Sequence, residues 1–157
     1  MKRTARDILK EKGSEIISVD ADAKVVDALE VMAKHNVGAV VVTRDGEQVG
    51  IWTERDLRVQ ILQKDFDHRT ASMSDYMNPH LIIADADEQV YQLYDRFLGQ
   101  RIRHVMVKEG EDIIGVLSVG DVVRASLHQK MREFEELNEI ISLEYYENWK
   151  IRQNERF

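Results

Sequence analysis

The chain has 157 residues, with no cysteine and a single proline. Without cysteine it has no disulfide framework, no thiol nucleophile and no cysteine-based zinc site. No apolar run approaches the roughly 18 residues that a membrane span needs, and no apolar signal core follows the charged N-terminus. The formal net charge is −7, a sign that opposes binding along a nucleic-acid backbone. We therefore expect a cytoplasmic protein with no membrane partner and no nucleic-acid partner.

Sequence patterns that are typical of enzymes are missing as well. We find no phosphate loop, no Gly-x-Ser-x-Gly, no His-Glu-x-x-His and no dinucleotide fingerprint. Four of the five histidines, His35, His68, His80 and His128, show no metal-ligand spacing, so we interpret them as structural or exposed. We therefore expect no catalytic residues and no metal site.

The sequence does contain an internal repeat. A shift of 65 residues aligns 16–61 with 81–126 without a gap, with nine identities in 46 positions. Average composition would give roughly three identities by chance. Asp20-Ala21-Asp22 falls on Asp85-Ala86-Asp87, and Gly50 falls on Gly115. The chain therefore contains two similar units.

Each unit has the same pattern of apolar residues, which predicts the order β-α-β-β-α. The helices that close the two units are expected at 54–62 and 119–127. We expect a mixed α/β (α+β) fold divided into four segments. These are 1–62 (first repeat with a lead helix), 63–72 (linker), 73–127 (second repeat) and 128–157 (C-terminal helical extension).

The C-terminal extension carries an apolar stripe at helical spacing. Its members are Leu127, Met131, Phe134, Leu137, Ile141, Tyr145 and Trp149. Packing is the ordinary explanation for such a stripe. The aromatic residues near its end, Tyr145, Tyr146, Trp149 and Phe157, also suggest a dimer contact or a surface for a partner protein.

A polar motif repeats where the third strand of each unit meets the following helix. It reads Gly50-Ile51-Trp52-Thr53-Glu54-Arg55-Asp56 in the first unit and Gly115-Val116-Leu117-Ser118-Val119-Gly120-Asp121 in the second. One interpretation is a capping box, in which the hydroxyl and the acid satisfy the backbone at the start of the helix. Trp52 occupies an apolar strand position and is expected in the core.

The same motif also suits a nucleotide. The N-terminus of a helix offers free N–H groups and a partial positive charge to a phosphate. The hydroxyl of Thr53 or Ser118 adds a donor, and Asp56 or Asp121 can accept hydrogen bonds from the two hydroxyls of a ribose. The motif alone does not decide between capping and binding.

The doubled unit, the strand Val37-Gly38-Ala39-Val40-Val41-Val42 and the doubled motif resemble the CBS domain, named for cystathionine β-synthase. The resemblance covers about residues 1–127. It implies a pseudo-two-fold module with two clefts between the repeats, in which family members bind AMP, ADP, ATP, S-adenosylmethionine or NAD. AMP is our first expectation for this chain.

The resemblance also implies roles for particular residues. Asp56 and Asp121 would hold ribose, Thr53 and Ser118 would hold phosphate, and Arg55, Arg103 and His104 would supply positive charge. The adenine would meet Ile17-Ser18-Val19 and Ile83-Ala84, with Gly38-Ala39 and Arg103-His104 lining the clefts. Gly120 replaces the arginine of the first motif, so the two clefts are expected to differ.

Two functions follow as hypotheses. In the first, the chain is a homodimeric sensor of an adenine nucleotide that acts on a separate protein through a conformational change. In the second, it is a ligand-free dimerising scaffold that recruits a partner through the C-terminal helix. The acid present in both motifs favours the sensor.

Overall fold

The structure is a computed structural model that describes residues 2–154, with side chains described for residues 2–144. The predicted positions Tyr145, Tyr146, Trp149 and Phe157 lie outside the described side chains. None of the helices searched is long and apolar enough to cross a membrane.

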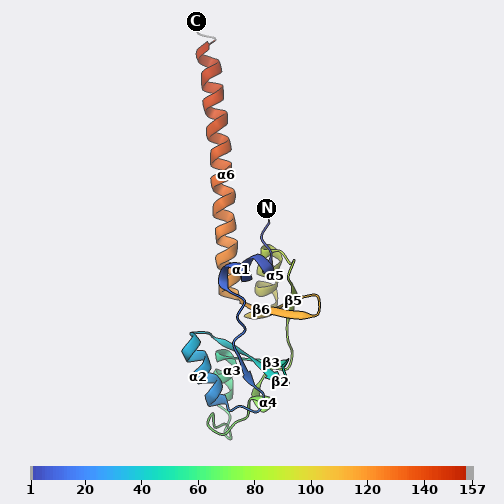
Figure 1. Cartoon of the computed structure of the whole chain (residues 1–157). Coiled ribbons are helices and arrows are strands. Elements are labelled where there is room, and N and C mark those ends of the chain that lie inside the picture. The colour runs from blue at the N-terminus through green and yellow to red at the C-terminus, as the bar shows by residue number, and fades with distance from the viewer. Residues whose placement is uncertain (1, 155–157) are drawn as a thin grey trace.

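The chain folds into two units of the same kind, placed one above the other in Figure 1. The first contains β1 (Ser18–Asp20), α2 (Val25–His35), β2 (Ala39–Arg44), β3 (Glu47–Thr53) and α3 (Glu54–Gln60). The second contains β4 (Ile83–Asp85), α5 (Val90–Gln100), β5 (His104–Glu109), β6 (Asp112–Ser118) and the start of α6 (Val119–Asn154). This order confirms the predicted β-α-β-β-α repeat.

The two sheets have the same topology and the same register. Each is three-stranded, with a parallel first pair and an antiparallel second pair. Val41 pairs with Ile51, and 65 residues later Met106 pairs with Val116. Each sheet also shifts register at the equivalent point, after Val42 and after Val107. The gapless sequence repeat therefore corresponds to a structural repeat that includes this irregularity.

Each unit has its own hydrophobic core beneath its sheet. Trp52 is fully buried in the first core, as predicted, and its indole N–H donates to Gln60 Oε1 at 2.9 Å. Leu117, the equivalent of Trp52, is fully buried in the second core. The alternation along the third strand thus places one large side chain of each motif in a core and leaves the following hydroxyl at the helix start.

The lead helices are exchanged between the repeats. Helix α1 (Ala5–Lys12) precedes the first repeat but packs on the second, where the Ala5 N–H donates to Glu88 O at 2.8 Å. Helix α4 (Met73–Tyr76) precedes the second repeat but packs on the first, where the Met73 N–H donates to Ala23 O at 2.9 Å. Each repeat is therefore packed against the lead helix that is covalently joined to the other repeat, and this holds the two repeats together.

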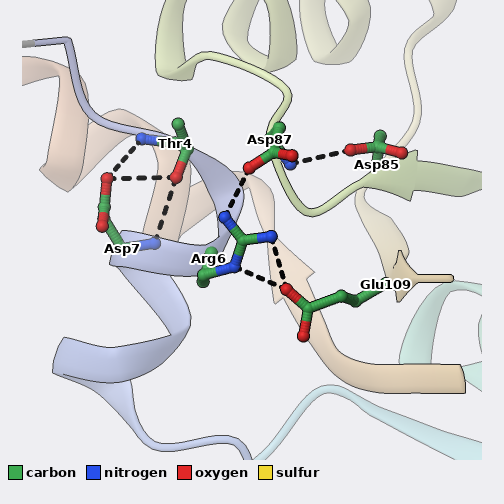
Figure 2. Close-up of polar contacts among 6 residues, drawn as sticks. All are labelled: Thr4, Arg6, Asp7, Asp85, Asp87 and Glu109. Carbon is green, nitrogen blue, oxygen red and sulfur yellow. Dashed lines mark hydrogen bonds and ion pairs between the residues drawn. The ribbon is translucent and has the colours of Figure 1, made fainter.

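Polar contacts hold α1 on the second repeat (Figure 2). The Arg6 guanidinium contacts the carboxylates of Asp87 and Glu109 on the second repeat, and its Nε donates to Glu109 Oε1 at 2.6 Å. The helix begins with a capping box, in which Thr4 N–H and Thr4 Oγ1 donate to Asp7 Oδ2 at 2.9 and 3.0 Å. Gly13 ends the helix with a φ of 99°, as its glycine predicts.

Helix α6 joins two predicted segments. The closing helix expected at 119–127 and the C-terminal helical extension expected from 128 form one helix that runs without a break from Val119 to Asn154. It leaves the body of the protein and projects into solvent (Figure 1). No glycine or proline lies between Asp121 and Asn154, so nothing in the sequence interrupts the helix.

Candidate functional site

Two cavities lie where the repeats meet. The Asp56 cavity has a volume of about 190 Å³ and contains the motif side chains Thr53, Arg55 and Asp56 of the first repeat. The Asp121 cavity has a volume of about 340 Å³ and contains Ser118 and Asp121 of the second repeat. Drug-sized ligands occupy pockets of roughly 300–1,000 Å³, so the Asp121 cavity is large enough without rearrangement.

The cavities are built from equivalent positions of the two repeats. Residues of the Asp56 cavity match residues of the Asp121 cavity at the 65-residue shift: Ile51 with Val116, Thr53 with Ser118, Ile82 with Ile17, Ile102 with Val37, and Met106 with Val41. Each cavity therefore lies between the motif of one repeat and the residue just before the first strand of the other repeat, which is Ile82 or Ile17. A molecule bound in either cavity would contact both repeats.

The motif acids cap their helices. Thr53 N–H and Thr53 Oγ1 both donate to Asp56 Oδ2 at 2.9 Å. Ser118 N–H and Ser118 Oγ both donate to Asp121 Oδ2 at 2.8 Å. The capping box that the sequence left as one interpretation is thus present in both repeats.

Capping leaves part of each carboxylate for other contacts. In the described part of the chain, every hydrogen bond that Asp56 and Asp121 accept ends on Oδ2. A carboxylate oxygen has two lone pairs, and Oδ1 of neither acid accepts a hydrogen bond there, although Arg124 Nη1 lies 4.0 Å from Asp121 Oδ1. Capping and ribose binding are therefore compatible in the same side chain.

Lys12 enters the Asp121 cavity from α1. Its Nζ donates to Asp121 Oδ2 at 2.5 Å and to Val116 O at 2.8 Å. Burial alone would raise the pKa of Asp121, but the hydrogen bonds from Lys12 and from Ser118 outweigh it and hold that pKa below its usual range. No pattern in the sequence predicts this contact, because Lys12 belongs to the segment that is exchanged between repeats.

His104 lines both cavities. It begins β5 opposite Ser118. Its Nδ1 is buried and has no hydrogen-bond partner among the described residues. Burial lowers the pKa of His104, and the positive charges of Lys12 and Arg103 add to that effect. A buried polar atom normally has a partner, so a ligand or a water molecule in either cavity would satisfy it.

The two cavities differ in charge. The cationic side chains of the Asp56 cavity are Arg55, Arg101 and Arg103, with His80 and His104 beside them, and Asp56 is its acid. The Asp121 cavity has Lys12 against Asp121 and Glu15. The Asp56 cavity therefore carries a net positive charge and the Asp121 cavity does not. Gly120 in place of the motif arginine accounts for part of this difference.

Most of the predicted site residues lie at the two cavities. Thr53, Asp56, Arg55, Arg103 and His104 line one of them. Ile17, Gly38, Ala39, Ser118 and Asp121 line the other, together with His104.

Four predicted adenine contacts are placed elsewhere. Val19 and Ala84 are buried in the two cores, and Ser18 and Ile83 are exposed outside the cavity linings. Because side chains alternate along a strand, the core-facing residue directs its neighbour to the opposite face. The residue that reaches each cavity is the one just before the strand, which is Ile17 in the first repeat and Ile82 in the second.

Several lining residues were missed from the sequence. These are Ile51, Asn78, His80, Leu81, Ile82, Arg101, Ile102 and Met106 in the Asp56 cavity, and Lys12, Glu15, Asn36, Val37, Val40, Val41 and Val116 in the other. His80, interpreted as structural or exposed, is exposed and also lines the Asp56 cavity. The 65-residue shift was the available signal, since applying it to Ile17 points to Ile82.

The family model of the CBS domain matches residues 5–63 and 73–128. The chain belongs to the CBS-domain family. It is 35% identical over 147 residues to the CBS domain-containing protein CBSX3, mitochondrial, of Arabidopsis thaliana, an alignment that covers 88% of this chain and 71% of that protein. It is also 31% identical over 116 residues to the arabinose 5-phosphate isomerase KdsD of Escherichia coli. That match covers 73% of this chain but only 35% of the isomerase, so the similar segment is about a third of that enzyme.

Solved structures share the fold. The CBS-domain containing protein ATU1752 from Agrobacterium tumefaciens superposes with a TM-score of 0.74 at 34% identity, covering 79% of this chain and 99% of that chain. The CBS domain pair of protein MJ0100, in complex with 5′-methylthioadenosine and S-adenosyl-L-methionine, superposes with a TM-score of 0.70 at 21% identity. It covers 82% of this chain and 99% of that chain.

Proposed function

We propose that this CBS pair is a regulatory module that binds an adenine nucleotide between its repeats and has no catalytic role. AMP is the first choice of ligand, followed by ATP, ADP, NAD and S-adenosylmethionine. The observation that carries the proposal is that each cavity joins the hydroxyl–acid helix start of one repeat to the other repeat. The protein MJ0100, whose CBS pair has this fold, was crystallised with two adenosine compounds.

The different charges of the two cavities favour different ligands. The arginines of the Asp56 cavity suit the phosphates of AMP, ADP or ATP, because guanidinium groups form strong charge-assisted hydrogen bonds with phosphate. The Asp121 cavity, where Lys12 already neutralises Asp121, suits an adenosine compound with less negative charge. In both, we expect the carboxylate Oδ1 to accept from a ribose hydroxyl, and His104 lines both cavities.

Regulation follows from the position of the ligand. A molecule that contacts both repeats binds best at one angle between them, and it shifts the population towards that angle. We propose that the changed angle is read by a separate protein, and that the module acts as a homodimer. A cytoplasmic location stays a prediction, since the name of the Arabidopsis relative places that protein in mitochondria.

Binding is tested by isothermal titration calorimetry with AMP, ATP, NAD and S-adenosylmethionine. We expect Asp56→Ala to abolish nucleotide binding at one site and Asp121→Ala to abolish it at the other. Asp7→Ala is the matched control, because Thr4 and Asp7 form the same capping box at a helix start outside both cavities. It should lower stability by about 1 kcal/mol, as the loss of a cap does, and leave the stoichiometry unchanged.

The second candidate function is a ligand-free dimerising scaffold. One observation favours it, which is that both motif acids are already engaged in capping. Thermal unfolding separates the two, because a ligand at 100 times its Kd stabilises the native state by about 2.7 kcal/mol. If no adenine compound at millimolar concentration shifts the unfolding temperature, the sensor is excluded and the scaffold remains.

A further inference from the structure

Helix α6 has one face against the body and an opposite face in solvent. Val122, Ala125 and Gln129 are buried against the second repeat. From Lys130 to Glu144 every side chain is exposed. The exposed side chains include Leu127, Met131, Phe134 and Ile141, which are 54–63% exposed. Large apolar groups arranged in a line on a projecting helix mark an interaction surface.

This exposed line lies opposite the body. Met131 follows Val122 by nine residues, Phe134 follows Ala125 by nine, and Asn138 follows Gln129 by nine. Nine residues make about two and a half helical turns, so each of these residues is on the far side of the helix from its buried counterpart. A second helix can therefore lie along this face without meeting the body of the same chain.

The spacing along this face is that of a coiled coil. Leu127, Met131, Phe134, Asn138 and Ile141 follow one another at four, three, four and three residues. This assigns Leu127, Phe134 and Ile141 to d positions and Met131 and Asn138 to a positions. A single asparagine at an a position sets the register and number of strands in such coils. A helix that projects alone also lacks the tertiary packing that supplies most helix stability in proteins.

The flanking charges favour a second copy of the same chain in parallel orientation. Lys130 precedes the a residue Met131 and occupies g, while Glu135 follows the d residue Phe134 and occupies e. In a parallel in-register pair, g of one helix faces the next e of the other, so Lys130 meets Glu135 of the second copy twice, by symmetry. In the single chain, Lys130 Nζ lies 3.5 Å from Glu133 and 5.0 Å from the centroid of the Tyr91 ring. Both contacts are exposed, and such contacts contribute about 1 kcal/mol or less each, so Lys130 can exchange them for Glu135 of a second copy.

We propose that the face of α6 formed by Leu127, Met131, Phe134, Asn138 and Ile141 pairs with the same face of a second copy in a parallel, in-register, two-stranded coiled coil. The pairing depends on α6 alone, so it does not require the nucleotide proposal. It places both CBS pairs at the same end of the coil.

The absence of cysteine from the chain makes a direct test possible with single-cysteine variants of the full chain in a redox buffer. We expect Leu127→Cys and Ile141→Cys each to form an intermolecular disulfide in more than half of the chains. Leu143→Cys is the matched control. Leu143 is 64% exposed, close to Phe134 at 63%, but lies two residues beyond Ile141, off the seam, and should stay reduced.

Light scattering of the cysteine-free protein at about 50 µM completes the test, and we expect the mass of two chains. A monomer overturns the proposal. So does a dimer in which neither seam cysteine links, because the copies then associate elsewhere. Linkage of only one seam variant indicates an antiparallel pair crossing near that residue, and linkage of Leu143→Cys indicates another face; each overturns the proposal.

Discussion

Lys12 Nζ donates to Asp121 Oδ2 at 2.5 Å, so a cation from the helix that precedes the first repeat contacts the motif acid of the second repeat. A ligand that approaches this acid must compete with Lys12 or form its contacts at Oδ1. The exchange of lead segments thus reaches both cavities, through Lys12 in the Asp121 cavity and Asn78 in the Asp56 cavity, but it brings a charge to only one of them. The residue equivalent to Lys12 at the 65-residue shift is Met77, which has no charge.

Replacing Lys12 tests this competition. We expect Lys12→Met to strengthen the binding of adenosine at the Asp121 cavity several-fold, because the acid is released from its internal partner. Calorimetric titration with adenosine measures the change, and Lys10→Met on the same helix, at an exposed position, is the control. Weaker adenosine binding in Lys12→Met would show that the lysine holds the ligand instead of competing with it.

The arginines of the Asp56 cavity should select for phosphate. We expect Arg103→Ala to weaken ATP binding about tenfold, the effect of one charge-assisted hydrogen bond of roughly 1.4 kcal/mol or more. The affinity for adenosine should change little, and the dependence of ATP binding on salt should become shallower. Arg44→Ala, at the exposed end of β2, serves as the control. Equal losses for ATP and adenosine would contradict a role in phosphate binding.

His104 should make stability depend on pH. Its folded-state pKa lies below the usual value of about 6.5 because the side chain is buried. Between the two pKa values the unfolded chain binds more protons, so stability is complete above about pH 6.5 and falls as the pH drops through and below that value. Lys12 and Arg103 favour this direction, whereas Asp121 and Asp56 oppose it.

Urea unfolding between pH 7.5 and 5 measures the effect. We expect the stability difference between wild type and His104→Gln to shrink as the pH falls. Wild type loses stability when His104 becomes protonated on unfolding, and the variant has no imidazole at this position to protonate. His35→Gln, at the exposed end of α2, should follow wild type throughout. A constant difference between wild type and His104→Gln at every pH would contradict the assignment.

The motif glycines should be required for packing. A Cβ on Gly50 would lie 2.5 Å from Met77 Sδ and 3.0 Å from Asn78 O, and one on Gly115 would lie 2.6 Å from Leu9 Cδ2. Both neighbours belong to the exchanged lead segments. We therefore expect Gly50→Ala and Gly115→Ala each to cost about 1–3 kcal/mol, as overpacking does.

Chemical denaturation measures these costs, with Gly99→Ala as the control. Gly99 lies in α5, and a Cβ there meets nothing within 4 Å. That substitution should stabilise the protein by up to about 1 kcal/mol through helix propensity. Wild-type stability in both motif variants would contradict this prediction, because it would show that Met77 and Leu9 can move away from the added methyl groups without loss of stability.

The sequence predicted what is local or repeated. The gapless shift between the two units predicted two sheets in the same register, and the hydroxyl–acid spacing predicted the helix starts at Thr53 and Ser118. The exchange of lead helices could not be predicted, because residues such as Ala5 and Glu88 are distant in sequence and their contact is set by the packing of whole repeats. The expected adenine contacts of Ile83 and Ala84, which the structure places outside the cavity linings, have a simpler explanation: a three-residue strand contains too few alternations to show which side faces the core.

Helix α6 begins at the candidate ligand site and ends far from it. Asp121 is in its first turn, and its 36 residues extend for about 54 Å at 1.5 Å per residue. A rod of that length acts as a lever: a tilt of one degree at its base displaces its tip by about 1 Å. A small rotation of α6 caused by ligand binding near Asp121 would therefore produce a much larger displacement at the far end of the helix.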